Sequence, residues 1–109
     1  MLVVTSFDLT GYEITEYKGL VHGIIVRSPT IVQGIFGAIK NILGGRIDSY
    51  TQMCAQSRQQ AYDEMVQDAA RLGANAIIGM RYDAAEVVSR SSASEVFCYG
   101  TAVVIAKTR

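Results

Sequence analysis

Charged side chains are scarce in this chain of 109 residues. They make up 18% of the sequence, ten basic and ten acidic, so the formal net charge is zero, whereas ordinary soluble domains carry roughly 25%. Binding to nucleic acid requires an excess of basic residues that neutralise phosphates, and this sequence has no such excess. We therefore expect no nucleic-acid partner. The small charged fraction also predicts that another protein covers part of the surface.

Long apolar runs are missing as well. The most apolar long segment, residues 31–45, is interrupted by Gln33, Lys40 and Asn41, whereas a membrane-spanning helix needs about 20 nearly unbroken apolar residues. The first eight residues, MLVVTSFD, have neither the basic start nor the apolar length of a signal peptide. The sequence therefore predicts no membrane segment and a cytoplasmic protein.

Cysteine and histidine are few and widely separated. Cys54, Cys98 and His22, together with four methionines, are the side chains that suit a soft metal. They form no CxxC, HxxxH or CxH pattern with the spacing of a metal site. Buried, apolar cysteines and reduced cytoplasmic thiols are the ordinary interpretation. Copies of His22 or Cys98 could still meet on a symmetry axis between subunits, so this second interpretation stays open.

Patterns typical of strands and helices fill most of the chain. Alternating or β-branched runs predict strands at residues 12–27, 75–88 and 94–107, and apolar residues at helical spacing predict helices at residues 31–43 and 49–72. Glycines at 19 and 23 inside the first strand indicate a bulge or a close backbone approach. The order strands–helix–helix–strand–strand predicts a single α+β domain over residues 1–109, with a largely antiparallel sheet and two helices.

Two glycines and an arginine separate the two predicted helices. Gly44 suits a left-handed helix end and Gly45 a sharp turn. Free backbone N–H groups at a helix start, together with the guanidinium of Arg46, have the ingredients of an anion site. We group Gly44, Gly45, Arg46 and Tyr50 as a candidate site for an anion or small molecule. Alternatively, the glycines only shape the turn and Arg46 pairs with a carboxylate of its own or a neighbouring subunit.

Parts of the predicted strands are apolar on both faces. The segments GIIV at 23–26, AII at 76–78 and AVVIA at 102–106 have no polar side. One layer of helices covers only one face of a sheet, so something else must cover the second face. A second copy of the chain is the simplest candidate. We therefore expect a homo-oligomer.

No residue pattern indicates catalysis. His22 is the only histidine, and the sequence places no nucleophile or orienting acid beside it. The serines within residues 89–94 lack the glycines of a nucleophile elbow. We therefore expect a protein that is not an enzyme and that needs no cofactor.

Four segments, in order over essentially the whole chain, carry a resemblance to a known family: EYKGLVHG, GIFGAIKNILGGRIDSY, ARLGANAIIGMRYD and VFCYGTAVVI. They resemble the YbjQ-like family of small bacterial and archaeal proteins, which also carries a heavy-metal-binding label. The resemblance implies an α+β, dodecin-like subunit that assembles into a ring, most often a pentamer, without an established activity. An acidic residue commonly follows the tyrosine of the GGR…Y segment in that family. Thr51 stands there in this chain, so a site that needs this carboxylate is not expected.

Three functional hypotheses follow from the residues and the resemblance. The first is a non-catalytic, homo-oligomeric binding or scaffold protein. The second is a heavy-metal-binding protein with sites between subunits, where the metal is suggested by the family label alone. The third is an anion or small-molecule binder at Gly44-Gly45-Arg46.

Overall fold

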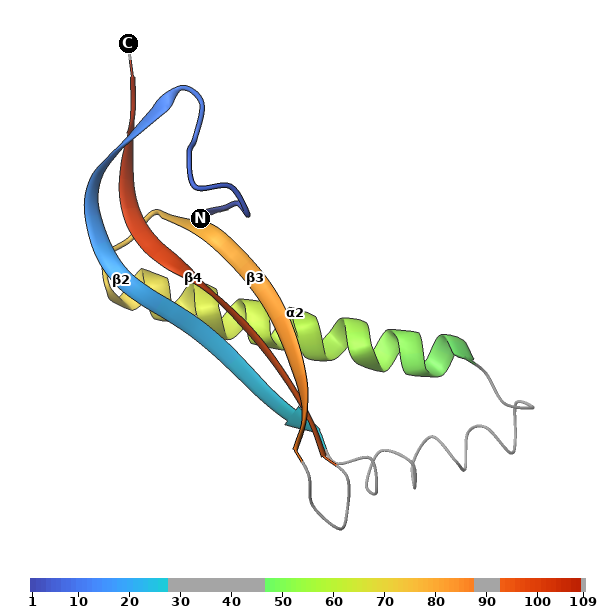
Figure 1. The fold of residues 1–109 in the computed structure, drawn as a ribbon. Helices are drawn as coiled ribbons and strands as arrows, with labels where there is room; N and C mark the ends of the chain where they lie inside the picture. The colour runs from blue at the N-terminus through green and yellow to red at the C-terminus, as the bar shows by residue number, and fades with distance from the viewer. Residues whose placement is uncertain (28–46, 88–92, 109) are drawn as a thin grey trace.

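A computed structural model describes residues 1–27, 47–87 and 93–108 of the chain. Its elements, in chain order, are β1 (Leu2–Val3), β2 (Tyr12–Arg27), α2 (Ile47–Arg71), β3 (Ala76–Val87) and β4 (Ala93–Lys107). The strands form one sheet in the order β1-β3-β4-β2. Strand β4 runs antiparallel to both of its neighbours, and β1 runs parallel to β3. The helix α2 crosses one side of this sheet (Figure 1).

The α+β class is confirmed, but the detailed fold prediction is wrong. We expected a largely antiparallel sheet with two helices in a ring-forming subunit, and the described residues form one helix and four strands in a mixed sheet. Strand β1 was missed because two residues cannot show an alternating pattern, and its parallel pairing with β3 makes the sheet mixed. The helix expected at residues 31–43 lies outside the described residues.

The face of the sheet under α2 holds the main hydrophobic core. Ala61, Met65 and Ala69 recur every four residues along the helix and are fully buried against Val21 and Cys98 of the sheet. This spacing places the three side chains on one side of a helix. The apolar residues at helical spacing therefore form a packed face in the central part of α2, whereas Cys54 near its start and Leu72 just after its end are exposed.

Glycine at position 23 brings β2 and α2 into unusually close contact. A Cβ atom at Gly23 would overlap the backbone oxygen of Ala61. No side chain can occupy that space, so only glycine permits this approach. Gly19, with a φ of 114°, lies where the β2–β4 register shifts. Both glycines therefore have the roles expected from their place inside a strand.

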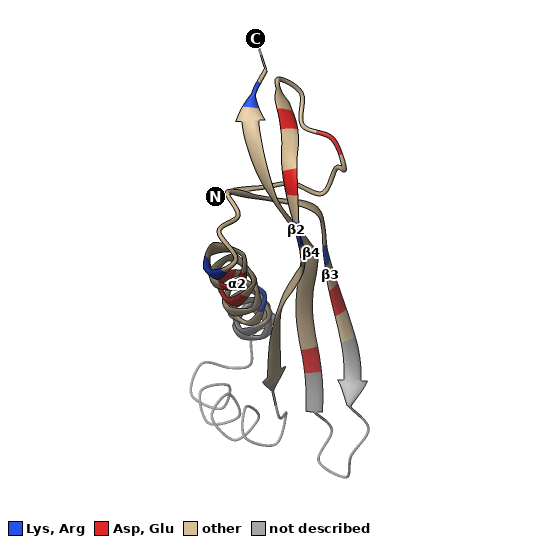
Figure 2. Cartoon of the chain, turned by 90° about the vertical axis from the view of Figure 1, so that its left-hand side faces the viewer, with Lys and Arg blue, Asp and Glu red and all other residues tan. Residues whose placement is uncertain are grey.

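The opposite face of the sheet is covered over only part of its length. Residues Ala76, Ile78, Val103 and Ile105 form a second cluster, packed against Val4, Leu9 and Ile14. The N-terminal segment is fixed there by backbone hydrogen bonds from Val4 N to Ile77 O (2.9 Å) and from Met80 N to Val4 O (3.0 Å). Figure 2 shows α2 on one side of the sheet and charged positions on each of β2, β3 and β4.

Candidate functional site

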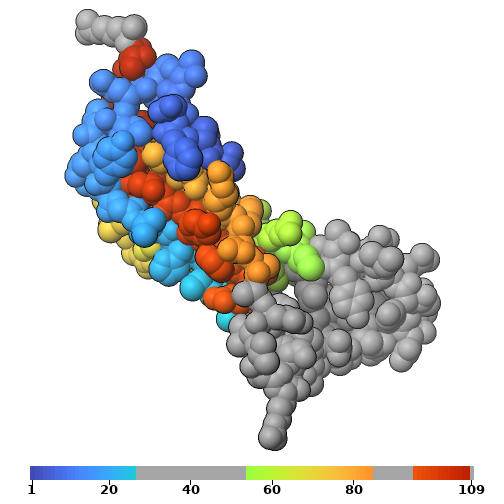
Figure 3. Space-filling view, viewed as in Figure 1, coloured from blue at the N-terminus to red at the C-terminus, as the bar shows by residue number. Residues whose placement is uncertain are grey.

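We call the part of the sheet that neither α2 nor the N-terminal segment covers the open face. It is made by Leu20, His22, Ile24 and Val26 of β2 and by Phe97, Tyr99 and Thr101 of β4. These side chains share one face because His22 lies opposite Tyr99, Ile24 opposite Phe97 and Leu20 opposite Thr101 in the antiparallel ladder. At its border on β3, the exposed charged residues Arg81 and Asp83 lie opposite Tyr99 and Phe97. Figure 3 views the sheet from this side.

Large apolar side chains of the open face are exposed to solvent. Leu20 is 78% exposed, Val26 59% and Ile24 42%. On the neighbouring strand the rings of Phe97 and Tyr99 stack with their centroids 5.5 Å apart. A sheet that faces water normally alternates apolar and polar positions. The open face therefore has the chemistry of a surface that contacts another protein rather than one that stays in water.

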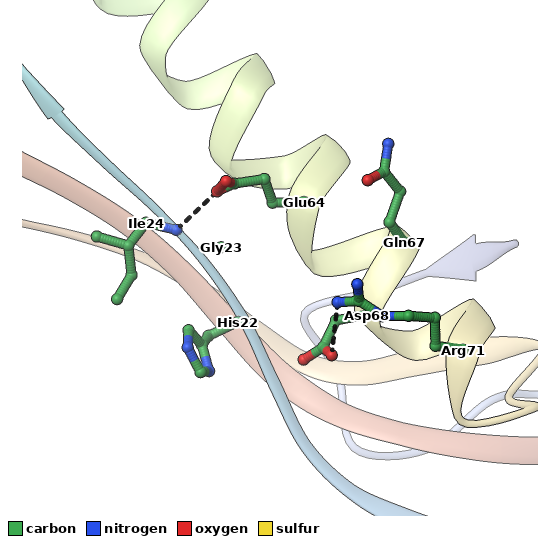
Figure 4. A pocket seen from close by; sticks show the side chains of 7 residues that line it. All are labelled: His22, Gly23, Ile24, Glu64, Gln67, Asp68 and Arg71. Atoms are coloured by element: carbon green, nitrogen blue, oxygen red, sulfur yellow. Dashed lines mark hydrogen bonds and ion pairs between the residues drawn. The ribbon is translucent and has the colours of Figure 1, made fainter.

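A second feature is a cavity beside β2, on the side where α2 packs. It has a volume of about 410 Å³ and is lined by His22, Gly23, Ile24, Glu64, Gln67, Asp68 and Arg71 (Figure 4). The close contact of Gly23 with Ala61 brings the next turns of α2 to the edge of β2. Glu64, Gln67, Asp68 and Arg71 follow one another at intervals of three, one and three residues, which places them on one side of the helix.

Two polar contacts organise the cavity. The backbone N–H of Ile24 donates a hydrogen bond to Oε2 of Glu64 at 3.3 Å. Farther along the helix, Nη2 of Arg71 lies 3.1 Å from Oδ1 of Asp68. The Arg71 side chain is 74% exposed, so this ion pair lies at the outer rim. The cavity therefore offers two carboxylates, one of which faces a strand edge directly.

The three metal-ligand candidates lie in three different environments. His22 is exposed on β2, and its side chain points to the open face. Cys98 is fully buried on the α2 side, where its Sγ lies 3.7 Å from the Sδ of Met65. Cys54 is exposed on α2. Within residues 1–27, 47–87 and 93–108, no three histidine, cysteine or carboxylate side chains are grouped so that they could hold a metal ion.

Burial determines the chemistry of Cys98. Desolvation raises the pKa of this thiol to about 11, and this effect outweighs the backbone hydrogen bond from Gly23, which lowers it. At neutral pH the thiol is therefore protonated and a poor nucleophile or metal ligand. The sequence interpretation of both cysteines as small buried apolar residues is confirmed for Cys98 and wrong for Cys54, which is exposed.

The candidate anion site is only partly within the described structure. Gly44, Gly45 and Arg46 lie outside the described residues, and Tyr50 belongs to the first turns of α2. Its role as an anion site or subunit contact stays a prediction.

The cavity residues on α2 were not recognised from the sequence as a site. Glu64, Gln67, Asp68 and Arg71 are polar residues on an amphipathic helix, and such residues ordinarily face solvent. A signal was present in Gly23, because glycine in a strand marks a close approach. The sequence alone does not show which part of the helix approaches that glycine.

Comparison with known proteins identifies the family. A family model described as "Putative heavy-metal-binding" matches residues 1–106. The chain belongs to this YbjQ-like family. A UPF0145 protein of Francisella tularensis (strain WY96-3418) is 54% identical over 105 residues, which cover 96% of this chain and 99% of that protein. A UPF0145 protein of Legionella pneumophila (strain Corby) is 48% identical over 105 residues, 96% of this chain and 98% of the relative.

A solved structure supports the fold of this YbjQ-like chain. The crystal structure of a protein with unknown function from Pediococcus pentosaceus, of the DUF74 family, matches with a TM-score of 0.67. The match covers 97% of this chain and 98% of the other, with 23% sequence identity. At that identity the likeness concerns the fold alone. Within the described residues, no helix is long and apolar enough to cross a membrane.

Proposed function

We propose that this protein is a non-catalytic, homo-oligomeric binding or scaffold protein whose subunits meet through the open face. The observation that carries the proposal is the exposure of Leu20, Ile24 and Val26 on one side of a single strand. Burying a side chain of this size contributes about 1.5–3 kcal/mol. Contact of the open face with another copy would bury these residues together with the ring pair of Phe97 and Tyr99.

The shape of the subunit supports the same proposal. Its radius of gyration is 17.6 Å and its principal extents are 59 × 27 × 20 Å, whereas a compact domain of this length has a radius of about 13 Å. An elongated chain buries less of its own apolar surface than a compact one. Association with further copies would supply the burial that one subunit lacks.

The non-catalytic part of the proposal rests on the environments of His22 and Cys98. His22 stands on an apolar surface, and no hydrogen bond from the described residues orients its ring for acid–base work. Cys98 is held protonated by burial, as its raised pKa shows. Neither group is arranged as a nucleophile with an activating base.

Sedimentation velocity on two lysine variants tests this proposal. In Leu20→Lys the new ammonium would have to be buried at the subunit contact, so we expect the variant to sediment as a monomer while the wild type sediments as an oligomer. Leu72→Lys is the matched control, because Leu72 is an exposed leucine just after α2 and outside the open face. We expect it to sediment like the wild type.

Two results would contradict the proposal: a wild type that stays monomeric at every concentration, or a Leu20→Lys variant that keeps the wild-type size. The pentamer implied by the family resemblance stays a prediction, and the same experiment measures the subunit number.

A further inference from the structure

Strand β2 ends the sheet on the side of β4, so one of its edges has no neighbouring strand in the described structure. The strand is 16 residues long. The backbone N–H of Ile24 points to this free edge, because it donates to Glu64 rather than to β4. Backbone groups alternate between the two edges of a strand. The backbone N–H and C=O groups of His22 and Val26, two residues to either side of Ile24, therefore point to the free edge as well.

A free edge of this kind can accept an additional strand. Its outward N–H and C=O groups form a ready template for the backbone of another extended chain. Proteins that bind peptides by strand addition use such an edge for affinity and an adjacent pocket for specificity. The cavity of about 410 Å³ lies beside this edge and includes His22, Gly23 and Ile24 in its wall.

The charges on the cavity wall indicate what a bound side chain should carry. Glu64 and Asp68 contribute two carboxylates and Arg71 one guanidinium, which is paired with Asp68. The wall is therefore net negative by one charge. Ionised carboxylates only accept hydrogen bonds, whereas ammonium and guanidinium groups only donate them. A lysine or arginine side chain complements this wall in both charge and hydrogen bonding.

We propose that the free edge of β2 binds an extended peptide segment of a partner protein, with a lysine or arginine of that segment in the cavity. Glu64 occupies the edge in the unbound protein, because its carboxylate accepts the Ile24 N–H that a carbonyl of an added strand would accept. When the segment binds, its carbonyl takes over this hydrogen bond and Glu64 pairs with the basic side chain. The site uses the backbone edge of β2 and side chains of α2, whereas the proposed oligomer contact uses side chains of the open face; His22 and Ile24 belong to both.

Fluorescence anisotropy with a labelled peptide tests this inference on the full chain in its natural assembly state. The probe is a blocked heptapeptide, Thr-Val-Thr-Lys-Thr-Val-Thr, and its partner probe has glutamate in place of the central lysine. We expect saturable binding of the lysine peptide and no binding of the glutamate peptide. Peptide binding should also slow the hydrogen exchange of the Ile24 and Val26 amides, because a backbone partner covers them.

The variant Glu64→Gln removes the charge but keeps an oxygen that can accept the Ile24 N–H, so the fold should persist. We expect this variant to bind the lysine peptide about tenfold more weakly, the loss typical of a hydrogen bond to a charged group. Asp63→Asn is the matched control. Asp63 is the adjacent residue on α2, hydrogen-bonded to Gln59 at 2.9 Å, and it is not part of the cavity wall. Its affinity should match the wild type.

Five outcomes would overturn the inference. The first is the absence of saturable binding, and the second is equal binding of the lysine and glutamate peptides. The third is equal affinity of Glu64→Gln and the wild type. The fourth is dissociation of the oligomer by the peptide, which would show that a second copy of the chain occupies the edge. Competition by free lysine amide at the same concentration as the peptide would likewise assign the cavity to small amines.

Discussion

Both faces of the sheet carry apolar residues, but the subunit itself covers these residues to different extents on the two faces. On β2, Val21 is fully buried under α2, whereas its neighbour Leu20 is among the most exposed apolar residues described. A strand with one face in water ordinarily carries polar residues on that face. Val21 makes its contact within the subunit, and our proposal is that Leu20 contacts another copy.

The largest effect should come from the covered face, at the contact between β2 and α2. We expect Gly23→Ala to lower the free energy of unfolding by about 3 kcal/mol, because the new Cβ meets the Ala61 backbone, which cannot rotate away. Urea unfolding followed by circular dichroism measures this loss. Gly19→Ala on the same strand is the comparison, since nothing lies within 4 Å of its Cβ position. There we expect only the backbone strain of a positive φ, about 1–2 kcal/mol. Equal losses in the two variants would contradict the close-contact explanation.

A second pair of variants separates the two faces directly. Met65 is fully buried under the sheet, so Met65→Ala should cost about 2–5 kcal/mol at every protein concentration. Leu20→Ala should destabilise the assembled protein, and this effect should shrink on dilution as subunits separate. Thermal unfolding across a dilution series measures both. A Leu20→Ala effect that does not depend on concentration would show that the open face is part of the fold of one subunit.

The two cysteines provide a smaller and pH-dependent contrast. Cys54 is exposed and Cys98 buried, so a thiol reagent at neutral pH should label Cys54 quickly and Cys98 only after unfolding. Burial raises the pKa of Cys98 from its ordinary value of 9.0 to about 11. Above pH 9 the unfolded chain therefore loses a proton that the folded chain keeps, and stability falls as the pH rises toward 11. Cys98→Ala should weaken this alkaline decline. Rapid labelling of both thiols in the folded protein would refute the buried position of Cys98.

The smallest effect should come from the rim of the cavity. The ion pair between Asp68 and Arg71 involves an arginine whose side chain is largely exposed, so water screens it strongly. We expect Asp68→Asn to change the free energy of unfolding by less than about 0.5 kcal/mol. Urea unfolding at low and high salt checks this value. A larger, salt-dependent loss would mean that the pair stabilises the last turn of α2.

Local sequence signals located the long elements of this fold well. An alternating, β-branched run predicted a strand at residues 12–27, and β2 has these bounds. The predicted helix at 49–72 and strands at 75–88 and 94–107 differ from α2, β3 and β4 by at most two residues at either end. Such signals act within one element, so they can be read from neighbouring residues.

Long-range pairing could not be predicted in the same way. The parallel contact of β1 with β3 joins Leu2 to Ala76 and Val3 to Ile77, and two residues carry no periodic pattern. The cavity was missed for a related reason, because Glu64 becomes part of a site only when α2 reaches the edge of β2 at Gly23. Patterns of polarity along a helix describe its faces, but they do not identify the strand that each face meets.

Native mass spectrometry of the untagged full chain tests the central claim, that the open face is covered by another copy. The account predicts a whole-number multiple of the chain mass for the wild type and the single-chain mass for Leu20→Lys. Two results would contradict it: a wild type detected only at the mass of a single chain at every concentration, or a Leu20→Lys variant detected at the same multiple of the chain mass as the wild type.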